Sequence, residues 1–181
     1  MRIVSGEFRG RVLTEFSGSD IRPTGDKVRE SLFNILQSRI IGSTFLDLFC
    51  GTGAVGIEAL SRGAKEVVVN DSAKASIGVV KKNVEKLKIA DRIIISNLDA
   101  LTYLKQGKKF DVIFIDPPYK SGLGYTAVNC AKSCLTDKGI IILEDEKKFN
   151  GQIDNELEIY DERKYGRVYL TFIRKVEKSE E

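Results

Sequence analysis

From residue 44 onward, short apolar runs alternate with amphipathic segments, and this alternation restricts the fold more than any other feature of the chain. The apolar runs have the length of buried strands, whereas the segments between them carry apolar residues at helical spacing. Strands are expected at 44–48, 66–70, 92–96, 110–115 and 139–144, and helices at 54–61, 74–87, 100–105 and 123–134. Repeated strand–helix–strand units predict an α/β fold, a parallel sheet with helices on both faces.

The two ends of the chain depart from this alternation. Near the start, two short strands are expected at 2–4 and 11–16. The stretch RPTGDKVRESLFNILQSRI then predicts an amphipathic helix, with Thr24 or Asp26 as its cap. Near the other end, alternating runs around Tyr165-Gly166 predict a hairpin that adds an antiparallel strand. One domain over 1–181 is expected, with an N-terminal hairpin and helix at 1–42, a core at 43–175 and a frayed tail at 176–181.

The composition restricts the possible chemistry. The chain contains no histidine, which excludes a serine–histidine triad, a histidine base and a histidine-ligated metal. Cys50, Cys130 and Cys134 have no metal-type pairing, so buried thiols and no metal site are expected. No apolar run approaches the roughly 20 residues of a membrane span, and the N-terminus lacks a signal-peptide pattern. These features predict a cytoplasmic protein without a membrane partner, and nothing in the sequence demands more than a monomer. The net charge of +3 is too small to indicate a nucleic-acid partner by itself.

Ligands of parallel sheets bind beyond the carboxyl ends of the strands, so the residues at those ends form the candidate site. After the first parallel strand, Gly51, Gly53 and Gly56 fit G-x-G-x-x-G, which lets a backbone loop approach a nucleotide-like ligand. The second strand ends at Asp71, which can accept hydrogen bonds from both ribose hydroxyls. The third is followed by Asp99, which either accepts from an adenine amino group or caps a short helix.

These residues fit both a dinucleotide oxidoreductase and an S-adenosylmethionine (SAM) methyltransferase. Asp47, which precedes the glycine loop, favours the methyltransferase. A carboxylate at that position attracts the methionine amino group of SAM, whereas it would repel a pyrophosphate.

The stretch Asp116-Pro117-Pro118-Tyr119 follows the fourth strand and suggests the reaction. An exocyclic amine of a base is a poor nucleophile, because its lone pair is delocalised into the ring. The Asp116 side chain and the Pro117 carbonyl can accept one N–H each and hold the nitrogen closer to tetrahedral. Proline fixes φ near −65°, so the carbonyl needs little reorganisation. Tyr119 can stack on a base that has been flipped out of its helix.

Taken together, the motifs resemble a known family. The combination of DPPY with LDLFCGTGAVGIEALSRGA is similar to the amino-group SAM methyltransferases, although DPPY alone occurs in many DNA and RNA enzymes. The stretches RIVSGEFRGR, IRPTGDKVRESLFNIL and KYGRV extend the resemblance over nearly the whole chain to the RsmD-type family, which methylates the N2 amine of a guanine in bacterial 16S rRNA. The resemblance implies a class I, Rossmann-like methyltransferase fold with a mostly parallel seven-stranded sheet and an antiparallel C-terminal strand. It also implies SAM as cofactor and 16S rRNA, a small ribosomal subunit or an assembly intermediate as partner.

The resemblance also assigns roles to residues. The expected cofactor-binding residues are Asp47, Cys50, Gly51, Thr52, Gly53, Asp71 and Asp99. The expected catalytic residues are Asp116, Pro117, Pro118 and Tyr119. The expected RNA-binding residues are Arg9, Arg11, Arg22, Thr24, Lys27 and Arg29. Asn70 stands where the family usually has an apolar residue, which leaves open whether Asn70 or Asp71 meets the ribose.

Four alternatives stay open at this point. A DNA adenine-N6 methyltransferase would share the DPPY chemistry, but it would usually need a further segment to read base edges. A nicotinamide-dependent oxidoreductase fits the glycine loop but not Asp47. A pyrimidine-carbon methyltransferase would use Cys50 as nucleophile, although that cysteine lies in the cofactor loop. An RNA-binding module without catalysis is the fourth, and the complete Asp116–Tyr119 stretch argues against it.

Overall fold

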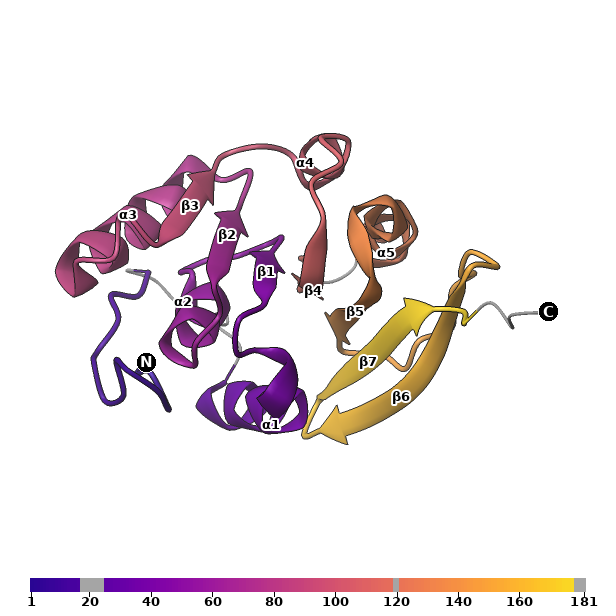
Figure 1. Ribbon diagram of the computed structural model, residues 1–181, viewed down its shortest axis with the longest axis horizontal. Helices are drawn as coiled ribbons and strands as arrows, with labels where there is room; N and C mark the ends of the chain where they lie inside the picture. The colour runs from indigo at the N-terminus through magenta and orange to yellow at the C-terminus, as the bar shows by residue number, and fades with distance from the viewer. Residues whose placement is uncertain (17–24, 119–120, 178–181) are drawn as a thin grey trace.

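The computed structural model describes residues 1–16, 25–118 and 121–177, and they form one seven-stranded sheet with helices on both faces (Figure 1). The strand order is β3-β2-β1-β4-β5-β7-β6. The strands are β1 Thr44–Asp47, β2 Glu66–Asn70, β3 Ile93–Ser96, β4 Phe110–Ile115, β5 Leu135–Asp145, β6 Leu157–Tyr165 and β7 Val168–Lys175. The helices are α1 Asp26–Leu36, α2 Ala54–Ser61, α3 Lys74–Leu87, α4 Ala100–Leu104 and α5 Leu123–Ala131, with 3-10 turns at Gln37–Arg39 and Lys132–Cys134.

The strand order changes direction between β1 and β4, and this change positions the site. β1 pairs in parallel with β2 on one side and with β4 on the other. The chain therefore moves toward one edge of the sheet from β1 to β2 and β3, and then crosses back to continue on the other side of β1 with β4. Such a change of direction opens a crevice at the carboxyl ends of β1 and β4. The glycine loop and the Asp116–Pro118 segment follow these two strands directly.

The alternation of side chains along the strands produces two cores. In β2, Val67 and Val69 belong to the cluster that packs against α1, α2 and α3, whereas Val68 belongs to the cluster that packs against α4 and α5. Figure 1 shows α4 and α5 across the sheet from α1 and α2. A strand that is buried on both faces is a continuous apolar run in the sequence, which is why these strands are readily predicted.

The N-terminal segment corrects one expectation. The strands expected at 2–4 and 11–16 do not form, and a single antiparallel bridge joins Arg2 to Val12. Backbone bonds still join its two arms, from the Ile3 N–H to the Arg11 carbonyl at 3.0 Å and from the Leu13 N–H to the Met1 carbonyl at 3.1 Å. The Val4 and Ser5 N–H groups instead donate to the Glu58 carboxylate at 2.8 and 2.9 Å. Because a helix side chain takes up these two N–H groups, the pairing of the two arms does not extend into a regular ladder.

Three further differences concern element ends and burial. Helix α1 begins after Gly25 without a side-chain cap; Asp26 lies in its first turn, and Thr24 falls outside the described residues. The helix expected through residue 134 changes to a 3-10 turn after Ala131. Of the cysteines, Cys50 and Cys134 are buried but Cys130 is exposed. Within the ranges that the structure covers, no helix is long and apolar enough to cross a membrane.

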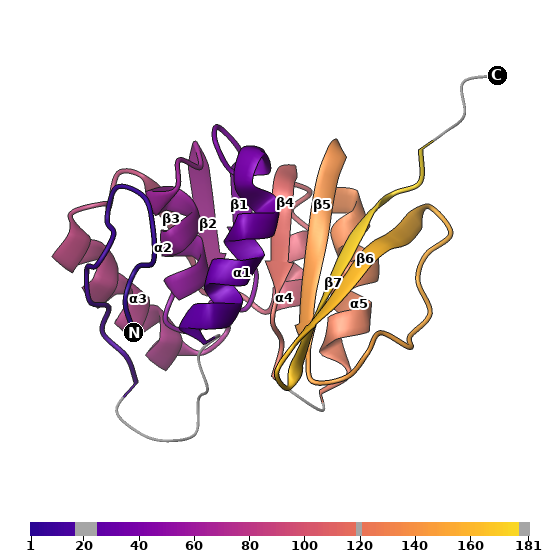
Figure 2. The same cartoon turned by 90° about the horizontal axis from the view of Figure 1, so that it is seen from below.

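The predicted C-terminal hairpin is confirmed. β7 runs antiparallel to β5 and to β6, and β6 forms the edge of the sheet. Figure 2 shows the turn between β6 and β7 at the lower end of the molecule, the end toward which the arrowhead of β4 points.

Candidate functional site

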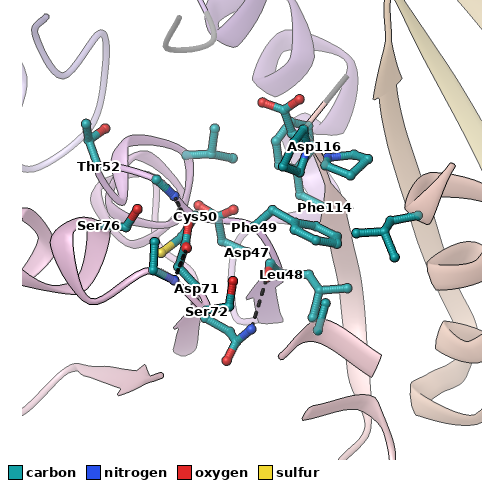
Figure 3. A pocket seen from close by; sticks show the side chains of 18 of the residues that line it. Asp47, Leu48, Phe49, Cys50, Thr52, Asp71, Ser72, Ser76, Phe114 and Asp116 are labelled. Carbon is teal, nitrogen blue, oxygen red and sulfur yellow. Dashed lines mark hydrogen bonds between the residues drawn. The ribbon is translucent and has the colours of Figure 1, made fainter. Parts of the chain in front are cut away.

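A cavity of about 550 Å³ lies at the carboxyl ends of β1, β2 and β4. Its volume falls in the usual range of small-ligand pockets. Of the residues expected from the sequence, it brings together Asp47, Cys50, Gly51, Thr52, Asp71, Asp99, Asp116, Pro117 and Pro118. In Figure 3, Asp47 lies between Asp71 and Asp116, in agreement with the position of β1 between β2 and β4.

The glycine loop is shaped by two different steric requirements. Gly53 has φ +78°, a conformation that residues with side chains rarely adopt. It does not line the cavity, and a Cβ atom there would lie 3.2 Å from Val80 Cγ2 of α3. A Cβ atom on Gly56 would lie 2.5 Å from Val69 Cγ1, so glycine is required there for α2 to approach β2. The loop and the start of α2 therefore hold their backbone N–H groups close to the cavity.

Asp47 is almost fully buried at the base of the cavity. Its Oδ2 accepts a hydrogen bond from the Gly56 N–H at 2.9 Å, which fixes the carboxyl against the start of α2. The pKa of Asp47 is raised from 3.8 to about 7, chiefly because the carboxyl is buried; the Gly56 hydrogen bond opposes this increase, and the charges of Asp71 and Glu144 add to it. A cationic group in the cavity would favour the ionised form of this carboxyl.

Asp71 and its neighbour Asn70 both line the cavity, but they differ in their hydrogen-bond partners. The Asp71 carboxylate accepts from the Gly51 N–H at 2.9 Å and from the Ala73 N–H at 2.8 Å. The fully buried Asn70 amide donates to the Leu48 and Leu98 carbonyls and so ties together the loops after β1 and β3. Asp71 is half-buried, and each of its oxygens keeps acceptor capacity, whereas Asn70 is fully buried; Asp71 is therefore the better candidate to meet a ligand hydroxyl.

Asp99 caps a short helix and also lies in the cavity wall. It is the N-cap of α4, where its Oδ1 accepts from the Thr102 N–H at 3.0 Å. It also lines the cavity and is exposed. Capping uses one oxygen, so the second oxygen can still meet a ligand.

The segment after β4 forms the opposite wall of the cavity. Asp116 is half-buried, Pro117 is buried and Pro118 is exposed. A Cβ atom on Gly124 would approach Pro117 Cγ to 3.3 Å, which shows how closely α5 supports this proline. The Pro118 carbonyl accepts from the Ser121 N–H at 3.3 Å. Tyr119 lies outside the described residues.

Cys50 is a poor candidate for a nucleophile. Burial, together with the charges of Asp47 and Asp71, raises the pKa of its thiol far above its usual range. A cysteine nucleophile reacts as the thiolate, which this environment disfavours. Cys50 instead contributes a small apolar side chain to the cavity wall.

The expected RNA-binding residues do not share one surface. Arg29 needs correction: its side chain is fully buried and forms an ion pair with Glu58, with 3.6 Å between Nε and Oε2, so it offers no surface to a phosphate. Arg9 and Arg11 are exposed on a turn that packs against Ser61, at the end of α2 far from the cavity. Lys27 is exposed in the first turn of α1. Arg22 and Thr24 fall outside the part of the chain that is described.

Sequence reasoning missed several contributors to the site. Phe16, Ser72, Ser76 and Leu123 also line the cavity. The buried Asn83 of α3 accepts from the Thr14 N–H at 2.7 Å and donates to the Thr14 and Thr52 carbonyls at 3.1 Å. It thus connects the cofactor loop to the segment that carries Phe16. In the sequence, this role is indicated only by the position of Asn83, a polar residue on the buried face of α3.

The cavity fits SAM in its volume and in the residues that line it. Asp47 suits a cationic amino group, Asp71 suits hydroxyls, and apolar side chains such as Phe49 and Phe114 line the remaining wall. The fold and this site together define a class I SAM-dependent methyltransferase.

The chain belongs to the RsmD family, since the family model described as conserved hypothetical protein 95 matches residues 1–174. It is 39% identical over 153 residues to ribosomal RNA small subunit methyltransferase D of Haemophilus influenzae, covering 81% of this chain and 79% of that protein. Among solved structures, the proposed methyltransferase yhhF of Escherichia coli is 32% identical with a TM-score of 0.87 and 97% of each chain covered. A more distant proposed methyltransferase, solved with SAH, shares the fold at 20% identity and a TM-score of 0.68, over 86% of this chain and 50% of that one.

Proposed function

We propose that this protein transfers a methyl group from SAM to the exocyclic N2 amine of a guanine in 16S ribosomal RNA. One observation carries the proposal: the glycine loop and the Asp116–Pro118 segment face the same cavity at the point where the strand order reverses. The names of the relatives support a small-subunit ribosomal RNA as substrate.

The residues of the site divide the reaction between them. When bound, SAM supplies an electrophilic methyl group on a sulfonium. The Asp116 carboxylate and the Pro117 carbonyl accept the two N–H groups of the target amine, which directs the nitrogen lone pair at the methyl carbon. As positive charge develops on that nitrogen, the Asp116 carboxylate stabilises it and is placed to accept the proton that the nitrogen loses. Tyr119 is proposed to stack on the extracted base.

The proposal includes the setting of the reaction. The substrate is 16S rRNA within a small ribosomal subunit or an assembly intermediate, which places the protein in the bacterial cytoplasm. The protein works as a monomer, because one chain supplies both walls of the cavity.

The decisive experiment is methylation of small ribosomal subunits that lack the modification, with the modified nucleotide mapped by mass spectrometry. Asp116→Ala is expected to lower kcat at least about 100-fold, because it removes one of the two acceptors and the stabilising charge. SAH binding, measured by calorimetry, should change less than about threefold, since the glycine loop is untouched. Asp91→Ala, an exposed aspartate before β3, serves as the matched control.

Two outcomes would contradict the proposal. Normal turnover by Asp116→Ala would remove the proposed mechanism. Methylation of duplex DNA in place of the ribosomal particle would favour the adenine-N6 reaction.

A further inference from the structure

The turn between β6 and β7 lies at the same edge of the sheet as the cavity. Ile115 pairs with Leu143, so Asp145, two residues further along β5, is level with Pro117. Asp145 pairs in turn with Tyr169, and Tyr169 with Lys164. The turn at residues 165–168 therefore projects beyond the level of the Asp116–Pro118 segment. Two strand spacings, about 10 Å, separate β4 from β7.

Strand pairing and packing hold this turn in place. Tyr165 pairs with Val168, so Gly166 and Arg167 form a two-residue loop. Gly166 has φ +60°, which suits glycine at the first position of such a loop. Val168 is buried, and Tyr165 packs against the core cluster that includes α1. The side chains of the loop are thus presented from a fixed base.

The charges on the last two strands are distributed unevenly. Three cations have acidic partners: Arg163 pairs with Asp161, Arg174 with Glu158 and Lys175 with Asp137. Lys164 and Arg167, the two cations nearest the cavity edge, are exposed and form no ion pair with any residue that the structure describes. Lys164 Nζ instead lies over the Tyr169 ring, 5.2 Å from its centroid.

We propose that Lys164 and Arg167 bind phosphates of the substrate RNA next to the target nucleotide; this inference rests on the proposed function. A base that enters the cavity brings its flanking backbone across the carboxyl edge of the sheet, within reach of a turn about 10 Å from β4. Unpaired cations on a rigid turn can neutralise phosphates without breaking existing ion pairs. The contact positions the RNA and reads no sequence. It places the RNA path on the β7 side of the cavity, whereas Arg9 and Arg11 lie near the far end of α2.

The test compares RNA binding by the double variant Lys164→Gln/Arg167→Gln with that of the unmodified protein over a series of salt concentrations. The probe is a single-stranded 16S rRNA fragment that contains the target guanine without its methyl group. The double variant is expected to bind about tenfold more weakly at 0.1 M salt, and its slope of log K against log salt should fall by about 1.4, or 0.7 per lost contact. With small ribosomal subunits, KM should rise while kcat and SAH affinity stay unchanged, because neither residue lines the cavity.

Two controls separate this inference from general effects of charge or folding. Lys65→Gln/Lys138→Gln removes the same charge from exposed lysines at the amino ends of β2 and β5 and should leave the salt slope unchanged. Lys164→Arg/Arg167→Lys keeps the charges and should bind as the unmodified protein does. If the Gln variant and the Lys65→Gln/Lys138→Gln control give equal slopes and KM values, the turn does not bind RNA. If the unmodified protein fails to methylate ribosomal subunits, the proposed function itself is wrong.

Discussion

At the scale of single residues, the buried Asp47 links pH to cofactor binding. Its pKa of about 7 in the free protein means that the carboxyl is largely protonated at pH 6 and largely ionised at pH 8. A ligand ammonium group requires the ionised form, so SAH affinity should rise about tenfold from pH 6 to pH 8. The chain has no histidine, which removes the residue type that usually titrates in this range. Calorimetry at the two pH values measures the effect. Asp47→Asn should bind weakly and show a flat profile, and equal affinities of the unmodified protein at pH 6 and 8 would contradict this role.

The same shift predicts how stability without ligand depends on pH. Because the pKa of Asp47 in the folded protein lies above its ordinary value of 3.8, the folded protein binds more protons than the unfolded chain between these two pH values. The contribution of Asp47 to the free energy of unfolding is therefore fully present below about pH 4 and is lost as the pH rises through about 7. Urea unfolding of Asp47→Asn, measured at the same pH values, should lack this component.

The sequence predicts residues of the cavity wall where chemistry and position agree. Asp47, Asp71 and Asp116 were identifiable because each is a carboxylate at the end of an apolar strand. Arg29 was misassigned to the surface although it falls on the stripe of Leu32 and Leu36, at helical spacing. Its counter-charge, Glu58, belongs to another helix, and no local pattern connects the two.

At the scale of elements, regular periodicity was sufficient for the core but not for the first segment. The bounds of α2, β2, α3 and β4 agree with those read from the sequence, because each buries a continuous or periodic apolar face. The N-terminal segment differs because Glu58 and Asn83, more than 50 positions away, satisfy its backbone groups. Sequence patterns report local periodicity and cannot report such distant side-chain acceptors.

Asn83 offers a test at this scale, because one side chain supports two elements of the site. Asn83→Ala removes the bonds to Thr14 and Thr52 and leaves buried backbone groups unsatisfied, so it should destabilise the protein by about 2–3 kcal/mol. It should also weaken SAH binding, since Thr52 belongs to the cofactor loop. Urea unfolding and calorimetry measure the two effects. Asn34→Ala, at an exposed position of α1, is the control, and equal results for both variants would show that Asn83 has no such role.

At the scale of the whole molecule, the carboxyl edge of the sheet gathers segments from across the chain. The glycine loop, the acids after β2 and β3, the Asp116–Pro118 segment and the β6–β7 turn all lie there, and the N-terminal segment adds Phe16. The α/β class and the direction of the strands were sufficient to predict this edge as the site. The contribution of Phe16 was not predictable, because it depends on how the N-terminal segment returns along α3.

This arrangement predicts that a cofactor stabilises the molecule as a whole, because the cavity joins loops from β1, β2, β3 and β4. A ligand at 100 times its Kd stabilises the folded state by about 2.7 kcal/mol. For a domain of this size, that corresponds to an increase in Tm of about 5–10 °C. SAH should produce this increase in differential scanning calorimetry, whereas NAD at the same concentration should not, because Asp47 repels a pyrophosphate. An increase with NAD would restore the oxidoreductase alternative, and no increase with saturating SAH would show that the cavity is not the cofactor site.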